Sequence, residues 1–112
     1  MASNFVPVEM VLNVYDANII WYYIPHFPGY EVSNFGHLRS MKHYKKYPYG
    51  IIIKPIIGTE VNNTNPLYEL SDENNKRVRI SLTDIINSAM NNTKIVNGYP
   101  RATYMVDVDS RN

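Results

Sequence analysis

The sequence predicts a small α+β fold, in which an antiparallel β-meander has one short helix packed on it. Three observations predict it. Short segments rich in β-branched and aromatic residues recur along the chain, with turn-forming residues between them. At Thr83 the apolar residues change from a period of two to helical spacing. The length of 112 residues and the apolar fraction of 45% are typical of one globular domain with a modest core.

The N-terminal residues 1–18 are expected to form an arm or an edge strand. Their apolar residues alternate with others, which is the period of a strand: Val6, Val8, Met10, Leu12 and Val14. Pro7 lacks a backbone N–H, so the predicted strand belongs at the edge of a sheet.

The first half of the meander is expected to contain strands at residues 19–24, 30–32, 37–41 and 51–57. The turn Ser33-Asn34-Phe35-Gly36 separates the second strand from the third. Asn and Gly both tolerate the positive φ that a tight reversal needs. Leu38 and Met41 are the candidates for inward-facing residues of the third strand, and Pro55 interrupts the fourth.

The second half is predicted to be a hairpin, a helix and a last strand. Strands at 67–70 and 76–82 are joined by Ser71-Asp72-Glu73-Asn74-Asn75, which has turn chemistry. Ser81 or Thr83 is the candidate N-cap of a short helix that ends near Asn91-Asn92. The apolar residues of this helix recur at helical spacing: Ile85, Ile86, Ala89 and Met90. A final strand is expected over residues 99–108, followed by a tail to residue 112.

Composition excludes several classes of protein. The chain has no cysteine, so disulfides, thiolate metal sites and a cysteine nucleophile are absent. The spacing of His26, His37 and His43 matches no metal pair, and neither a metal nor a cofactor is expected. There is no signal peptide and no apolar run of membrane-spanning length, so neither secretion nor a membrane partner is expected.

One segment concentrates positive charge although the net charge is only +1. From Val32 to Thr59 there is no Asp or Glu, while cationic and aromatic residues interleave. Such side chains can neutralise phosphates and stack on bases. The alternative is a solvated lysine loop beside core tyrosines, which composition alone favours. The candidate nucleic-acid contacts are Arg39, Lys42, Lys45, Lys46, Lys54, Tyr44 and Tyr47.

Arg77 and Arg79 are two further candidates, because they share one face of the strand 76–82. They could enter a nucleic-acid groove or pair with a carboxylate such as Glu69 across the hairpin. Cross-strand pairing is the safer interpretation.

Together these segments resemble the nuclease-associated modular domain (NUMOD) of the type that begins with a Trp-containing strand. The resemblance rests on Trp21-x-x-Ile24, on Pro28-Gly29-Tyr30-Glu31-Val32-Ser33-Asn34-x-Gly36-x-Leu38-Arg39-Ser40, and on the IIIKP strand at 51–55. RISLTDIINSAM at 79–90 is similar to the following strand and helix of the family. The resemblance thus covers residues 21–98. It implies a small sheet laid against DNA, with basic loops on phosphates, usually preceding an HNH homing endonuclease.

The resemblance also implies that catalysis has been lost. In the family a histidine that starts the catalytic HNH unit follows the helix, whereas Gly98 stands at that position here. No histidine follows His43, and a metal-dependent nuclease needs an imidazole to deprotonate water. The chain is therefore not expected to be an enzyme, and residues 19–98 are expected to form a NUMOD/HNH-like domain with a degenerate, truncated HNH region.

Two functions remain, from different classes. The first is a non-catalytic DNA-binding module that derives from an HNH-type homing endonuclease and is encoded by a phage. It would act in the host cytoplasm, with duplex DNA as its partner. The second is a structural or interaction protein of a bacteriophage or large DNA virus particle that reuses the inactive fold. Its partners would be other viral structural proteins or further copies of itself. A nuclease completed in trans by a separate chain is a weaker third interpretation.

Overall fold

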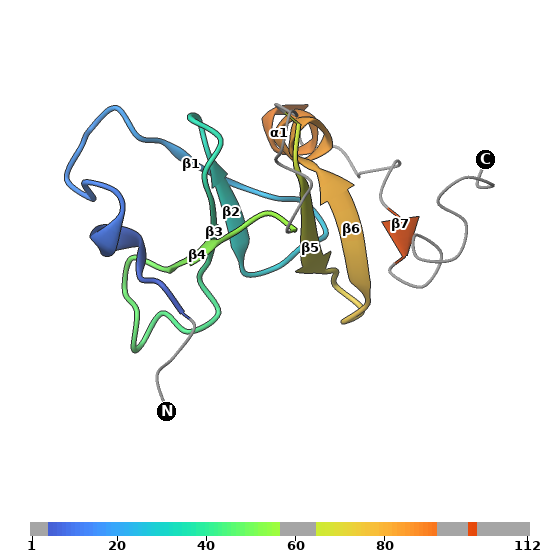
Figure 1. The fold of residues 1–112 in the computed structure, drawn as a ribbon, viewed down its shortest axis with the longest axis horizontal. Coiled ribbons are helices and arrows are strands. Elements are labelled where there is room, and N and C mark those ends of the chain that lie inside the picture. The colour runs from blue at the N-terminus through green and yellow to red at the C-terminus, as the bar shows by residue number, and fades with distance from the viewer. Residues whose placement is uncertain (1–4, 57–64, 92–98, 101–112) are drawn as a thin grey trace.

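The computed structural model describes residues 5–56, 65–91 and the backbone of 99–100 (Figure 1). It contains one 3-10 helix, η1, one α-helix, α1, and seven strands in this part of the chain. In chain order these elements are η1 (Val8–Met10), β1 (Trp21–Tyr23), β2 (Tyr30–Ser33), β3 (Leu38–Ser40), β4 (Ile51–Ile53), β5 (Leu67–Ser71), β6 (Arg77–Ser81), α1 (Leu82–Asn91) and β7 (Tyr99–Pro100). The predicted α+β class is confirmed.

The first sheet is an antiparallel meander with the strand order β1-β2-β3-β4. Side chains alternate between the two faces of a sheet, so the register decides which residues share a face. Val32 pairs with Leu38, and Leu38 pairs with Ile53, so these three apolar residues lie on one face. Glu31 pairs with Arg39 on the opposite face.

The second sheet is separate, with the order β5-β6-β7, and it stands beside the first in Figure 1. The sequence predicts one small sheet, whereas the structure divides the strands between two. The division follows β4, which ends at Ile53 just before Lys54-Pro55. The proline cannot donate a ladder hydrogen bond. After it, Ile56 N–H donates to the Leu67 carbonyl (2.8 Å), but no ladder between β4 and β5 forms in the described residues.

A single core fills the space between the two sheets and the helix. Its buried residues come from both sheets and from α1: Ile24, Phe27, Tyr30, Val32, Leu38, Tyr68, Leu70, Ile80 and Ile85. Helix α1 contacts β1, β2 and β6, so it covers the junction of the two sheets. Each fully buried large aliphatic side chain contributes about 1.5–3 kcal/mol of hydrophobic free energy. Burial, rather than hydrogen bonds between strands, therefore joins the two sheets.

The β2–β3 turn is held by the side chain of Ser33. Its Oγ accepts hydrogen bonds from the N–H groups of Phe35 (3.1 Å) and His37 (3.0 Å). Gly36 takes φ = +89°, a conformation that favours glycine. Asn34 has no positive φ, so that part of the turn prediction is wrong. Its side chain instead ties the turn to the strand entry, accepting from Ile20 N–H (2.8 Å) and donating to the Asn18 carbonyl (2.9 Å).

The N-terminal arm does not form the predicted strand over residues 6–14. Only its beginning lies along the sheet, where Pro7 makes an isolated antiparallel bridge with Ile51. After Pro7 the carbonyls of Pro7 and Val8 accept hydrogen bonds from Met10 and Val11, which turns the chain into η1. Val8 is buried, whereas Met10 is exposed. Val6, Leu12 and Val14 are half-buried, so the alternating residues other than Met10 turn inward although no strand forms beyond Pro7.

The predicted hairpin and helix are both confirmed. Strands β5 and β6 pair from Leu67↔Ser81 to Ser71↔Arg77. Ser81 is the N-cap of α1, because its Oγ accepts a hydrogen bond from Asp84 N–H (3.2 Å). Ile85 is buried and Ile86 and Ala89 pack on the core, but Met90 is exposed.

The end of the chain is described only in part. Residues 99–100 form β7 and pair with Val78 and Arg79, so the predicted last strand begins where expected. Its continuation to residue 108 lies outside the described residues. Among the helices of the described part, none is long and apolar enough to cross a membrane.

The substitution Ser33→Ala should destabilise the fold by about 1–3 kcal/mol, because it removes the acceptor of two part-buried hydrogen bonds from turn N–H groups. Urea denaturation followed by circular dichroism measures the change. Phe35→Ala in the same turn, where the ring is exposed, is the control and should stay within about 0.5 kcal/mol of wild type. Equal stability of the Ser33 variant and wild type would contradict this account of the turn.

Candidate nucleic-acid interface

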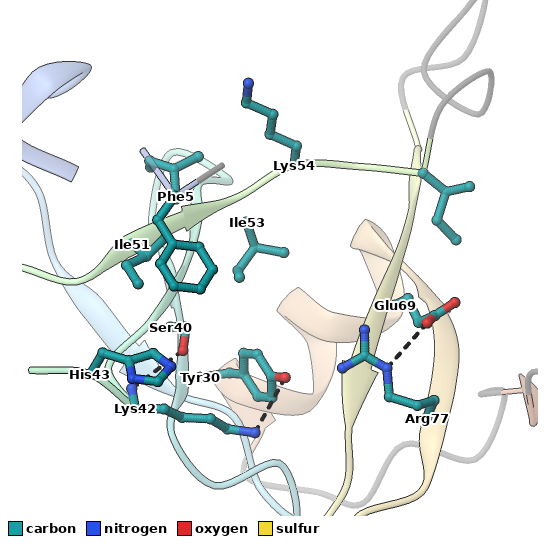
Figure 2. Close-up of a pocket in the computed structure, with 12 residues that line it drawn as sticks. Phe5, Tyr30, Ser40, Lys42, His43, Ile51, Ile53, Lys54, Glu69 and Arg77 are labelled. Atoms are coloured by element: carbon teal, nitrogen blue, oxygen red, sulfur yellow. Dashed lines mark hydrogen bonds and ion pairs between the residues drawn. The ribbon is translucent and has the colours of Figure 1, made fainter. Parts of the chain in front are cut away.

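A cleft of about 530 Å³ lies between the end of the first sheet and the hairpin of the second (Figure 2). One wall consists of the arm, strand β4 and the loop after β3, and the other carries the pair Glu69–Arg77. Tyr30 lies between the two walls. The lining residues are Phe5, Tyr30, Ser40, Lys42, His43, Ile51, Ile52, Ile53, Lys54, Ile56, Glu69 and Arg77. The cleft thus combines apolar side chains with three cations and one carboxylate.

The predicted site residues Lys42, Lys54 and Arg77 all line this cleft, although they are far apart in the sequence. Lys42 lies beside Tyr30 on the first wall, and Lys54 extends from the outer rim in Figure 2. Arg77 approaches from β6 of the second sheet. Folding therefore concentrates positive charge that the sequence distributes over two segments.

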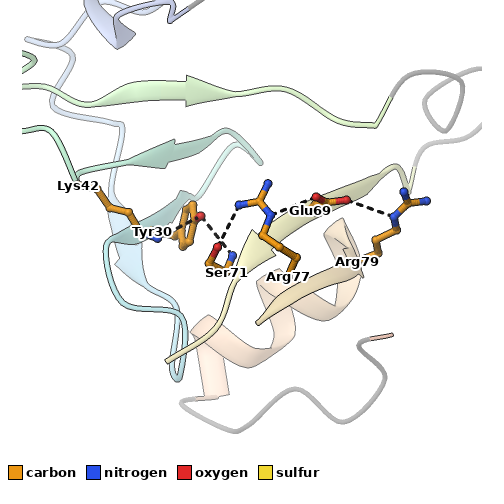
Figure 3. Close-up of polar contacts among 6 residues, drawn as sticks. All are labelled: Tyr30, Lys42, Glu69, Ser71, Arg77 and Arg79. Atoms are coloured by element: carbon orange, nitrogen blue, oxygen red, sulfur yellow. Dashed lines mark hydrogen bonds and ion pairs between the residues drawn. The ribbon is translucent and has the colours of Figure 1, made fainter. Parts of the chain in front are cut away.

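A continuous polar network crosses the junction of the sheets (Figure 3). The Lys42 ammonium donates to the Tyr30 hydroxyl (3.3 Å), which also accepts from Ser71 N–H (3.2 Å). The Ser71 hydroxyl accepts from Arg77 Nη1 (3.0 Å). The network thus connects the loop after β3 to both strands of the hairpin.

Glu69 completes the network by accepting from two guanidinium groups. Arg77 Nε donates to its Oε2 (3.1 Å) and Arg79 Nε donates to its Oε1 (3.3 Å). The predicted cross-strand pairing of these arginines is confirmed. One carboxylate shared by two guanidinium groups leaves an excess of one positive charge on this hairpin face. Arg77 is half exposed, whereas Arg79 is largely buried.

The environment of Tyr30 lowers its pKa below the ordinary value of 10.0. Burial by itself raises the pKa of this phenol, but the hydrogen bond from Ser71 N–H and the bond and charge of Lys42 together outweigh it. The Lys42 ammonium also lies 4.4 Å from the centre of the Tyr30 ring. Lys42 is thus held at the cleft by the ring and the hydroxyl of one tyrosine.

Gly29 gives Lys42 the space to lie in this position. A Cβ atom at residue 29 would approach Lys42 Cγ to 2.6 Å, and Gly29 has φ = +88°. Its carbonyl also accepts a hydrogen bond from Met41 N–H. The Gly-Tyr pair therefore fixes both the backbone and the side chain that bring Lys42 to the cleft.

Arg39, another predicted site residue, lies on the opposite face of the first sheet. It donates from Nη2 (2.6 Å) and Nε (3.0 Å) to Glu31 Oε1, and from Nη1 to the Tyr49 carbonyl (3.0 Å). Its guanidinium carbon is 4.0 Å from the centre of the Trp21 ring. The geometry gives Arg39 partners within the protein and places it on the face opposite to Tyr30 and Lys42.

The remaining predicted residues belong to the loop between β3 and β4. Lys45, Lys46 and Tyr44 are exposed, and Lys46 Nζ lies 5.5 Å from the centre of the Tyr47 ring. The Phe5 ring stacks on His43 (5.6 Å, 27°) and meets Tyr47 edge to face (6.1 Å). Sequence reasoning missed Phe5 and placed His43 in no site, because only folding brings the arm against this loop.

No metal centre is formed by the described residues 5–56 and 65–91, which contain no group of three His, Asp or Glu side chains able to hold an ion. His26 instead pairs with Glu73 at the tip of the hairpin (3.0 Å).

A comparison with known protein families gives a match to the first half of the chain. Residues 20–62 match the NUMOD4 motif, a DNA-binding-associated module of nuclease-containing proteins. The match includes β1 to β4 and the basic loop, and it confirms the resemblance to a nuclease-associated modular domain. No curated protein and no solved structure matches the chain significantly.

The matched segment ends before the hairpin and the helix. The similarity of residues 79–90 to the family's strand and helix therefore stays a prediction, as does the loss of an HNH histidine. Gly98, which stands at the expected position of that histidine, lies outside the described residues.

Replacing Lys42 by Met should raise the pKa of Tyr30, because the cation that favours the phenolate is removed. Wild type and the Lys42→Met variant are each compared with the same protein carrying Tyr30→Phe as well. The difference in absorbance at 295 nm within each pair isolates the titration of the Tyr30 phenol. Lys46→Met, which leaves Tyr30 untouched, is the control.

The same shift predicts how stability depends on pH. The folded protein has the lower Tyr30 pKa, so the unfolded chain binds more protons between that value and 10.0, and Tyr30's contribution to the free energy of unfolding rises with pH across this window. The contribution is present above pH 10.0 and is lost as pH falls through the folded pKa. An unchanged Tyr30 titration in Lys42→Met would contradict the network.

The substitution Arg39→Lys should lower the free energy of unfolding by about 2 kcal/mol, since an ammonium cannot reproduce the paired bonds to Glu31 together with the bond to Tyr49. Urea denaturation measures the loss. Lys45→Gln, which removes an exposed cation from the nearby loop, should change stability by less than about 0.5 kcal/mol. A stability equal to that of wild type would assign Arg39 no structural role.

Proposed function

We propose that this chain is a non-catalytic DNA-binding module derived from an HNH-type homing endonuclease and encoded by a phage. The observation that carries the proposal is the NUMOD4 match over residues 20–62. The segment that matches also contains the long stretch without Asp or Glu, from Val32 to Thr59. Duplex DNA is the proposed partner.

The lysines of this segment make the proposed phosphate contacts. Lys42, Lys45, Lys46 and Lys54 are exposed, and none of them has a carboxylate partner among the ion pairs of the described residues. Such cations bind phosphates at little cost in broken ion pairs, and they release counterions from DNA. Tyr44 and Tyr47 flank them and supply secondary contacts to the backbone.

The three arginines have a different proposed role. Arg39 and Arg79 are largely buried and paired with carboxylates, so their proposed role is to stabilise the two sheets and not to contact DNA. Arg77 is paired but half exposed, and a phosphate can share its guanidinium with Glu69. Phosphate contacts carry no sequence information, so contacts made mainly by the lysines predict binding with little sequence preference.

Binding without cleavage is part of the proposal. Gly98 occupies the position where the resemblance expects the general base, and the sequence has no histidine after His43. A chain without that imidazole has no group to activate water in the HNH manner. Purified chain with Mg²⁺ is therefore expected to bind duplex DNA and leave it intact.

The alternative function is a structural or interaction protein of a virus particle. Large apolar side chains are exposed along the arm and β1, where aromatic and aliphatic groups would suit the core of a protein interface: Met10, Val11, Tyr15, Ile20 and Tyr23. A stable oligomer in sizing experiments, with no affinity for DNA, would favour this alternative over the first.

The salt dependence of binding tests the DNA proposal. The logarithm of the association constant should fall linearly with the logarithm of salt concentration, with a slope of about −0.9 for each phosphate contact. Lys45→Gln with Lys46→Gln should therefore reduce the slope by about 2, as measured by fluorescence anisotropy with a labelled duplex. Lys76→Gln, at the exposed β5–β6 turn, is the control and should keep the slope. An affinity for duplex DNA that stays constant as salt rises would contradict the proposal.

A further inference from the structure

We infer that the cleft between the two sheets holds one unpaired nucleotide of a DNA strand, with the base beside Phe5 and the phosphate on Lys42. This inference rests on the proposed function and adds to it: the exposed loop lysines bind backbone phosphates, whereas the cleft distinguishes an unpaired nucleotide from a paired one.

The size of the cleft suits a single small group. Its volume of about 530 Å³ lies within the range of about 300–1,000 Å³ of pockets that enclose small ligands. A base inside a duplex is stacked and paired, so it cannot enter a recess without leaving the helix. An unpaired or extruded base has already lost those contacts and enters at lower cost.

The apolar side of the cleft suits a planar ring. Phe5 is half exposed, and the ring is braced by its stack on His43 and its edge contact with Tyr47. Ile51 and Ile53 lie beside it on β4 in Figure 2. An aromatic ring that is held by its neighbours and still half exposed can stack a base without a large loss of its own conformational freedom.

The polar side of the cleft suits an anion. Three of its ionised lining groups are cations, namely Lys42, Lys54 and Arg77, and one is an anion, Glu69, so the cleft carries a positive excess. Arg77 already shares Glu69 with Arg79, which leaves the carboxylate little capacity to neutralise the two lysines. The Lys42 ammonium is held on the Tyr30 ring and hydroxyl at the boundary between the cationic and apolar parts.

A nucleotide matches both the apolar and the cationic side of the cleft, because one sugar joins its planar base to its charged phosphate. An acidic peptide would satisfy the lysines but would leave Phe5 and the isoleucines in water. The combination of a braced, exposed ring with the cations therefore favours a nucleotide.

The test compares three DNA ligands of the same sequence: a blunt duplex, the same duplex with one unpaired nucleotide at its centre, and the single strand. Fluorescence anisotropy at constant salt should show about tenfold tighter binding of the bulged duplex than of the blunt one. Phe5→Ala should abolish this preference, so that the variant binds the bulged and the blunt duplex with equal affinity. Phe35→Ala removes another exposed ring, which lies outside the cleft in the β2–β3 turn, and should keep the preference.

A second measurement locates the base directly. Iodouracil placed at the bulge should crosslink on irradiation to Phe5, His43 or Tyr30 of the cleft. Crosslinking outside the cleft, or equal affinity of wild type for bulged and blunt duplexes, overturns this inference and leaves the proposed function in place. Absence of binding to all three ligands overturns both.

Discussion

The contacts of Tyr30 are the constraint on which the arrangement of the two sheets depends. Its ring is buried in the shared core, and its hydroxyl accepts the Ser71 N–H of the second sheet and a bond from Lys42 of the first. No strand-to-strand ladder joins β4 to β5 in the described residues, so packing and this polar connection set the relative position of the sheets. The same position forms the cleft, which therefore exists only while Tyr30 keeps its place.

The chemistry of the surface follows from how charges are partnered. Two glutamates pair with all three arginines that the sequence analysis selected. Glu31 of the first sheet holds Arg39 against Trp21, and Glu69 of the hairpin pairs with the other two arginines. The lysines after β3 have no such carboxylate because their segment contains none. Residues of similar charge are thus separated into structural arginines and exposed lysines, and only the second group is available to a phosphate at low cost.

Local sequence signals succeeded where one residue type satisfies a local geometric need. Ser33 and Gly36 make the β2–β3 turn, Ser81 caps α1, and the register of the hairpin follows its alternating pattern. The alternation of Val6 to Val14 failed, because a period of two shows a strand only if a neighbouring strand pairs along its length. Beyond Pro7 no such neighbour exists among the described residues, and the local bonds of η1 replace the ladder.

The sequence by itself determined the α+β class, the order of turns and strands, the basic segment and the likeness to a nuclease-associated module, because each depends on neighbouring residues. Tertiary structure alone decided that the strands form two sheets, that Arg39 faces away from Lys42, and that Phe5 stacks on His43. These are contacts between segments far apart in the chain. Their geometry depends on how the whole core packs, which no local pattern of residues specifies.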